Sequence, residues 1–195
     1  MKSVFTSMLL FITMLLFSAC GVVSLSPKQK SIKESSSYVY TQVPMWTEKN
    51  RIIGTNYSRG LFIPLNSPVK IISIDSRKIV FTYLDTKLSY YTYTKYTKVD
   101  SGGMLERLFS TKKVNLSKYS RKKRKYISNG KIVVGMTKEE VILARGYPPF
   151  HATLSLKSNT WKYWENRFKT INVKFRKNKV VATVGYKPRN LIRFY

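Results

Sequence analysis

The sequence of 195 residues has few of the residues from which active sites are usually built. It contains one cysteine, one histidine and nine acidic residues, against 36 lysines and arginines. A single cysteine excludes an internal disulfide, and with a single histidine it supplies too few of the usual ligands for a zinc site. The sequence also brings no two acids together as the acid and base of a glycosidase. We therefore expect a binding protein and not an enzyme, with no cofactor and no small-molecule substrate.

The shortage of acids leaves a formal net charge of +27. A protein surface with this much positive charge attracts phosphate-rich or acidic partners. The chain is nevertheless 43% hydrophobic and 14% aromatic, which is enough to build packed cores. Basic residues interleaved with tyrosines can indicate nucleic acid binding, but that function conflicts with the export signal described next. We predict no nucleic acid partner.

Long apolar runs are confined to the N-terminus, where Val4 to Phe17 follow the basic Lys2. A bilayer span needs about 20 apolar residues, so this shorter run predicts an export signal. Its end, Ser18-Ala19-Cys20, resembles the lipobox of bacterial lipoproteins. The resemblance implies cleavage after residue 19 and acylation of Cys20 with fatty chains, which anchor a protein to a membrane. The alternative is an ordinary cleaved signal followed by a spare cysteine.

The residues after the cysteine predict two further regions. Gly21, by the sorting habit of such lipoproteins, is compatible with transfer to an outer membrane. Residues 20–44 are rich in serine, lysine and glutamine, and we predict a flexible tether there.

Residues 45–115 form the next predicted unit, a small β-rich module. Segments rich in isoleucine, valine, tyrosine and threonine alternate with glycine and proline turns, which favours a small antiparallel sheet or half-barrel. The segment IPLNSPVKI resembles bacterial SH3-like modules. A short helix is expected to cover the sheet, because four apolar residues recur at helical spacing. These are Met104, Leu105, Leu108 and Phe109, and we expect core packing for Tyr90, Tyr91, Tyr93 and Tyr96.

Residues 116–195 predict two helices followed by three antiparallel strands, and hence an α+β fold for the whole chain. The second helix has clear end signals: Thr137 and Glu140 have the spacing of a capping box, while Gly146 and Pro148 favour a stop. A loop holding the lone His151, which we interpret as solvated or structural, precedes the strands. The strand segments are NTWKYWENR, KTINVKFR and KVVATVGY, and they alternate as strands with one packed face do.

These same residues carry a family resemblance. The motifs GMTKEEV, GYP, NTWKYW, NRF, INVKF and KVVATV, over about residues 131–186, resemble the outer-membrane assembly lipoproteins called BamE, also known as SmpA/OmlA. The same unit is also similar to secreted β-lactamase-inhibitor proteins. The BamE resemblance implies an accessory lipoprotein on the periplasmic face of an outer membrane, which steadies the β-barrel assembly machinery and touches anionic lipid. By position, the partner-binding edge would comprise Pro149, Phe150, Trp161, Tyr163 and Arg167.

One basic run lies on the first of the two helices. Two interpretations are open. The run is either a solvated helix face or a contact with anionic headgroups, where each cation contributes about 1 kcal/mol to membrane binding. The run comprises Arg121, Lys122, Lys123, Arg124 and Lys125.

Together these features predict a lipid-anchored envelope protein that acts as a non-catalytic accessory of outer-membrane β-barrel assembly or of envelope integrity. Its expected partners are the membrane and outer-membrane assembly proteins. The alternative is a secreted or surface binding or inhibitor module that recognises cell-wall polymer or anionic lipid.

Overall fold

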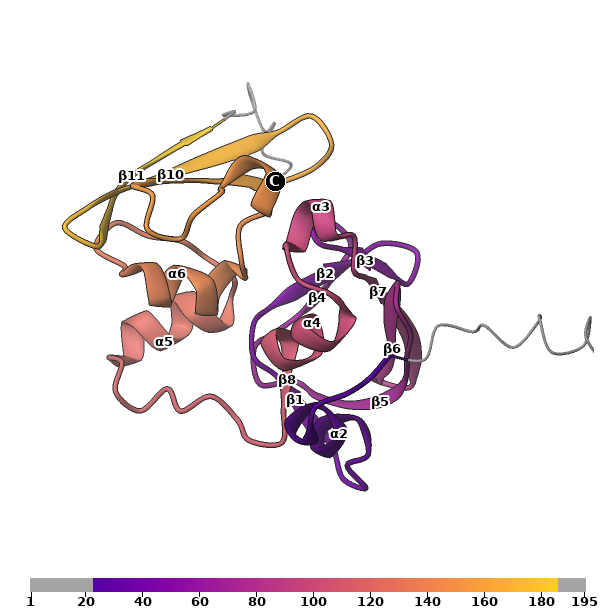
Figure 1. The fold of residues 1–195 in the computed structure, drawn as a ribbon. Coiled ribbons are helices and arrows are strands. Elements are labelled where there is room, and N and C mark those ends of the chain that lie inside the picture. The colour runs from indigo at the N-terminus through magenta and orange to yellow at the C-terminus, as the bar shows by residue number, and fades with distance from the viewer. Residues whose placement is uncertain (1–22, 186–195) are drawn as a thin grey trace, which may run out of the picture.

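The computed structural model describes residues 23–185, which form an α+β fold with two hydrophobic cores (Figure 1). One core lies in the first module, residues 26–110. The other lies mainly in the second module, residues 121–185, and also includes Leu65 of the first module. The second module contains two helices followed by a three-stranded antiparallel meander, so the expected fold class is confirmed. The expected signal and Cys20 lie outside the described residues.

The prediction of a flexible tether is wrong from Ser26 onward, because this part of the segment is folded. Helix α2 (Pro27–Lys33) begins with a capping box, in which the Ser26 hydroxyl accepts from the Gln29 backbone and the Gln29 side chain accepts from the Ser26 backbone. Ile32 on this helix is buried in the first core. Strand β1 (Val39–Thr41) then enters the sheet, so this segment is part of the first module.

The main sheet of the first module has six strands in the order β3-β7-β6-β5-β1-β8, and it curves around a helix (Figure 1). We expected an antiparallel sheet, but this sheet is mixed. Strand β3 runs parallel to β7, with Arg51 opposite Ser89. A separate antiparallel pair, β2-β4, completes the strands. Their bounds are β2 (Met45–Thr47), β3 (Arg51–Ile53), β4 (Leu61–Ile63), β5 (Pro68–Ile74), β6 (Lys78–Tyr83), β7 (Thr86–Tyr91) and β8 (Phe109–Ser110).

The helix inside this curve is α4 (Ser101–Leu108), and the short α3 (Thr94–Thr97) precedes it. The expected stripe of α4 packs into the first core. The helix begins earlier than expected, because the Asp100 carboxylate accepts a hydrogen bond from the Gly103 backbone at 2.8 Å and caps it. Phe109 belongs to β8 instead, and its ring meets that of Phe81 edge-on at 5.1 Å.

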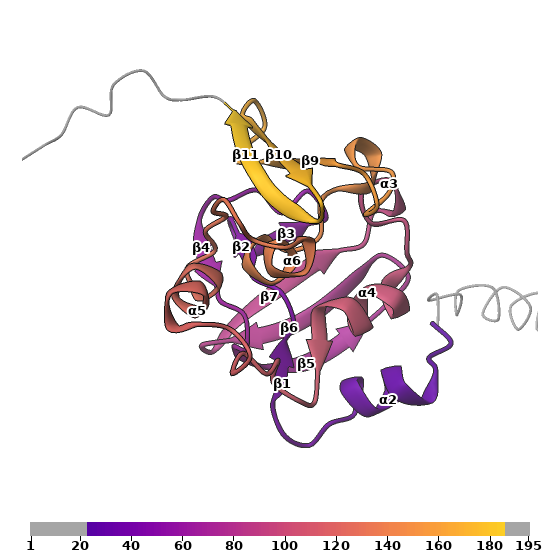
Figure 2. The same ribbon diagram turned by 90° about the vertical axis from the view of Figure 1, so that its left-hand side faces the viewer.

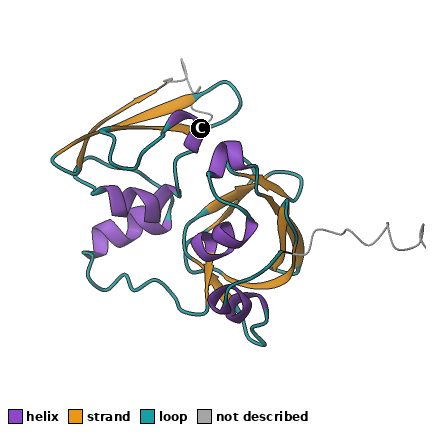
Figure 3. Cartoon of the chain, in the orientation of Figure 1, coloured by secondary structure: helices purple, strands orange, loops and turns teal. Residues whose placement is uncertain are grey.

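The second module consists of helices and a separate three-stranded sheet (Figures 2 and 3), and these elements follow the sequence signals closely. The Thr137 hydroxyl accepts from the Glu140 backbone, and the Glu140 carboxylate accepts from the Thr137 backbone at 2.7 Å, so the capping box is confirmed. Gly146 ends the helix with a φ of +83°. The elements are α5 (Arg121–Ser128), α6 (Lys138–Arg145), the 3-10 helix η1 (Phe150–Ala152), β9 (Thr160–Trp164), β10 (Thr170–Arg176) and β11 (Lys179–Gly185).

The three strands pair in the order β11-β10-β9, and one face of the sheet is packed. Val173 and Phe175 are buried, while the alternating residues Lys174 and Arg176 are exposed. The alternation in the sequence predicted this pattern. The two-residue turn after β10 has positive φ at both Lys177 and Asn178, which suits a tight hairpin. Within residues 23–185 no helix is both long and apolar enough to span a membrane.

Candidate functional site

Most of the partner-binding edge expected from the family resemblance is buried. Trp161 is 0% exposed and packs on Phe175, with ring centroids 4.8 Å apart. Tyr163 is 1% exposed, and its hydroxyl donates to the Gly146 carbonyl at 3.0 Å. Both point from β9 into the second core, and Pro149 is buried too. These three residues stabilise the fold and are not available to a partner.

The rest of the expected edge stays accessible. Phe150 is half-buried and Arg167 is exposed in the loop after β9. Trp164, on the opposite face of β9 from Trp161, is also half-buried, so one aromatic of this strand remains partly accessible.

The basic run lies on α5, where Arg121, Lys122, Arg124 and Lys125 are exposed. Lys123 differs from its neighbours because its Nζ lies 2.7 Å from the buried Glu140 carboxylate on α6. Four cations of this run therefore remain at the surface, while Lys123 joins the two helices.

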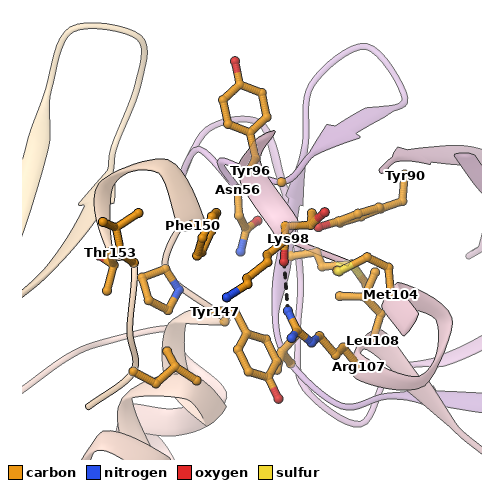
Figure 4. A pocket seen from close by; sticks show the side chains of 18 residues that line it. Asn56, Tyr90, Tyr96, Lys98, Met104, Arg107, Leu108, Tyr147, Phe150 and Thr153 are labelled. Carbon is orange, nitrogen blue, oxygen red and sulfur yellow. Dashed lines mark hydrogen bonds between the residues drawn. The ribbon is translucent and has the colours of Figure 1, made fainter. Parts of the chain in front are cut away.

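A cavity of about 130 Å³ lies between the two modules, and we call it the junction pocket (Figure 4). Its first-module wall includes Met45 on β2, Tyr90 on β7 and Met104 on α4. Its second-module wall includes Tyr147 and Phe150, which follow α6. Apolar side chains dominate both walls, as is common in binding pockets.

An apolar rim adjoins this pocket. Leu154 and Leu156 line it from the loop after η1, and Leu154 is 70% exposed although it is a large aliphatic residue. Two exposed leucines beside a concave apolar pocket form a surface that a partner can cover.

Two cations also line the junction pocket. Lys98 extends from the end of α3, and its Nζ lies 4.9 Å from the centroid of the Phe150 ring. Arg107 on α4 donates from Nη1 to the Thr97 carbonyl at 3.1 Å, and its guanidinium lies 5.1 Å from the Tyr147 ring centroid. Within the described residues neither cation has a carboxylate at ion-pair distance. The pocket therefore combines an apolar interior with uncompensated positive charge.

A buried arginine joins the two modules beside the pocket. Arg145, the last residue of α6, stacks over the Trp46 ring of the first module at 4.2 Å and donates to the carbonyls of Asn56 and Trp164 at 3.0 and 2.8 Å. Burial lowers its pKa to about 10, and the nearby Tyr163 and Glu165 oppose that shift. The Asn56 amide returns a bond to the Arg145 carbonyl at 3.2 Å.

Gly130 brings a second close approach between the modules. Its φ is +67°, and a Cβ added there would lie 3.0 Å from the Trp46 ring and 3.1 Å from the Phe62 ring. Gly130 directly follows Asn129, the C-cap of α5. The contact with Trp46 and Phe62 gives this glycine a packing role as well.

An aromatic row crosses the same junction on the outside. Successive ring centroids are 5.9, 6.2, 5.0 and 5.0 Å apart. Arg51 lies 4.7 Å from the first ring of the row and Lys95 lies 5.9 Å from the third. The row comprises Tyr91, Tyr93, Tyr96, His151 and Trp164.

The prediction of core packing for the four tyrosines is wrong for three of them. Only Tyr90 of the four is buried, and burial raises its pKa. Tyr93 is 44% exposed. Partial desolvation, and then the charges of Lys95 and Lys162, lower the pKa of His151 below its usual value of 6.5, which favours a neutral ring within the row.

Sequence reasoning missed the cations and the leucines of the junction pocket. Lys98 and Arg107 are two of many basic residues, and only the meeting of the modules distinguishes them. Leu154 and Leu156 did leave a signal, because large aliphatic residues are unexpected in a loop of threonine, serine and lysine.

No group of three or more histidine, cysteine or acidic side chains that could hold a metal ion occurs within residues 23–185. Comparison with protein-family models, with curated proteins and with solved structures gives no match to this chain.

Proposed function

We propose that this protein is a lipid-anchored adaptor on the periplasmic face of an outer membrane, which acts without catalysis as an accessory of β-barrel assembly. The observation that supports the proposal is the second module, whose two helices and antiparallel meander have the order that the BamE resemblance implies. The resemblance also includes the Thr137 helix start, which is formed here as a full capping box.

The partner surface differs from the one that the resemblance implies. Trp161 and Tyr163 are in the core, so the surface available from that edge consists of Phe150 and Arg167. Phe150 also lines the junction pocket. A protein partner that reaches Phe150 would therefore touch the first module as well.

Photo-crosslinking in intact envelopes tests this proposal. A photoreactive residue at position 167, in the loop after β9, is expected to crosslink to proteins of the barrel-assembly core. The matched control is the same probe at position 177, in the exposed turn on the far side of β10. Equal crosslinking from both positions, or none from position 167 to any barrel-assembly protein, contradicts the proposal.

The lipid anchor is tested separately, because Cys20 lies outside the described residues. We expect Cys20→Ala to release the protein from membranes and to remove the mobility change that acylation causes. Continued membrane partitioning of this variant with unchanged mobility would show that the chain is not a lipoprotein.

One observation favours a second function, the recognition of cell-wall polymer. Aromatic rings that run along a surface provide flat faces for sugar rings, and the cations beside them suit acidic groups on the polymer. The aromatic row has both properties.

Sedimentation with isolated cell wall tests this function. We expect Tyr93→Ala to reduce the fraction that sediments, because this tyrosine contacts its neighbours in the row on both sides. Phe168→Ala is the control, since Phe168 is an exposed aromatic outside the row. Equal loss in both variants, or no sedimentation of the wild type, rejects this function.

The exposed cations of α5 suit anionic lipid headgroups, with about 1 kcal/mol for each near such a surface. Serine at Arg121, Lys122, Arg124 and Lys125 should weaken binding to vesicles that contain phosphatidylglycerol. The control is serine at Lys174, Arg176, Lys177 and Lys179, four exposed cations at the β10-β11 turn. If both sets weaken binding equally, α5 has no special role and only net charge matters.

A further inference from the structure

We infer that the junction pocket is an anchor site for one aromatic side chain in an acidic peptide segment of a protein partner. This inference rests on the proposed function, because it specifies which part of the adaptor a protein partner occupies. It also moves the principal contact from β9 to the seam between the modules.

The size of the pocket determines what can enter it. An apolar cavity of about 150 Å³ holds one benzene molecule, and the junction pocket measures about 130 Å³. One side-chain ring fits such a space, whereas most of a long fatty chain would remain outside. The volume therefore favours an aromatic side chain over a lipid tail.

The surroundings of the pocket are those of a protein contact. Interface hot spots are well-packed pockets that take an aromatic anchor and are ringed by residues that exclude water. Leu154 and Leu156 are placed to form part of such a ring, because they line the pocket and are exposed in its absence. Once a peptide covers them, their apolar surface leaves water, which is favourable.

Charge determines what flanks the anchor. Lys98 and Arg107 both line the pocket, and neither has a carboxylate partner within the described part of the chain. Their nearest aromatic contacts, Phe150 and Tyr147, do not neutralise them. Acidic residues beside the anchor would supply the missing charge, and basic residues there would be repelled.

Both modules contribute walls, so the occupant touches both. The methyl groups of Met45 and Met104 belong to the first-module wall, and Met136 lies in the second core away from the pocket. These methionines provide reporters of binding, with Met136 as an internal control.

The experiment titrates the folded protein, with its methionine methyl groups labelled with carbon-13, with three short peptides. The first has the sequence Asp-Asp-Phe-Asp-Asp with blocked ends, the second replaces the aspartates with lysine, and the third replaces the phenylalanine with alanine. We expect the first peptide to shift the Met45 and Met104 signals saturably and to leave Met136 unchanged. The other two should bind about tenfold more weakly or not at all.

Matched lysine variants identify the cation. Lys98→Ala should weaken binding of the first peptide several-fold, whereas Lys95→Ala should leave it unchanged, because Lys95 is a nearby lysine that does not line the pocket. Phe150→Ala should weaken it too. An unchanged Met136 signal in each variant shows that the fold is retained.

Three results would overturn the inference. The first is an absence of shifts at Met45 and Met104 with the acidic peptide, and the second is equal binding of the lysine peptide. The third is a response of these methionines to phosphatidylglycerol vesicles but not to peptide, which would assign the pocket to lipid. Crosslinking from position 167 to the barrel-assembly core does not depend on these outcomes, so failure of the anchor site and failure of the proposed function are distinguishable.

Discussion

The two modules place their aromatic residues differently. In the second module Trp161, Tyr163 and Phe175 fill the core. In the first module most of the core is aliphatic. Tyr91 is half-buried and Tyr93 is exposed in the row that leads to the other module. These three rings of the second module thus contribute to its stability. The rings of the row lie instead on the first module and at the junction.

The largest expected effect comes from the second core. Trp161→Ala should destabilise the protein by about 3–5 kcal/mol, because it removes a fully buried indole and leaves a cavity. Tyr93→Ala, at the surface of the first module, should cost less than about 1 kcal/mol. Chemical denaturation measures both changes. Comparable losses would mean that the row is as much a part of the core as Trp161.

The contact between the modules should give the next largest effect. Arg145→Ala leaves the carbonyls of Asn56 and Trp164 without their donor and removes the stacking on Trp46. We expect a loss of about 2–3 kcal/mol in the free energy of unfolding. Arg124→Ala, on the exposed face of α5, is the control and should change it by less than about 0.5 kcal/mol. Equal stability of the two variants would show that the junction contributes nothing.

Loss of the N-terminal cap should have a smaller effect on stability, and the effect should differ between the two helices of the second module. Thr137→Ala should cost about 1 kcal/mol through loss of the cap on α6. Ser120 caps α5 through a longer contact of 3.4 Å with the Lys123 backbone, without a reciprocal bond, so Ser120→Ala should cost less. Thermal melting of both variants measures the difference. A melting temperature unchanged by Thr137→Ala would contradict the role of the capping box.

The smallest effect is a pH dependence at the junction. The lowered pKa of His151 means that the unfolded chain binds a proton before the folded one as the pH falls. The contribution of this residue to stability is therefore present above pH 6.5 and is lost as the pH drops from there toward the lowered pKa. His151→Gln should lessen the fall in melting temperature between pH 7.5 and 5.5. The same fall in both proteins would locate the titrating group elsewhere.

Local signals explain how far the sequence predicted the fold. The Thr137 capping box acts over a few residues and formed as expected, and the local Lys177-Asn178 turn joins two of the predicted strands. The parallel pairing of β3 with β7 joins Arg51 to Ser89, and no local pattern specifies such a pairing. Helix α2 did have a signal, since Ser26, Pro27 and Gln29 match a capping box with proline at the first helical position. The polar composition of the segment favours a tether, and that prediction is wrong over α2.

The candidate site was less predictable than the fold. Alternation along β9 separates Trp161 and Tyr163 from Trp164, but it does not tell which side faces the core. The junction pocket depends on the meeting of α3 and α4 with the segment after α6, which are distant in the chain. No motif within either module could therefore have indicated it.

The packing at the boundary restricts how this chain can be divided. Leu65 of the first module is buried in the second core, and Tyr147 of the second module packs against the first. A gene fusion that transferred residues 121–185 alone to another protein would separate Gly130 from Trp46 and Phe62, the first-module rings that pack against it. We therefore expect the two modules to be inherited together. A descendant that kept only one module would need new polar residues on the surface exposed at the junction.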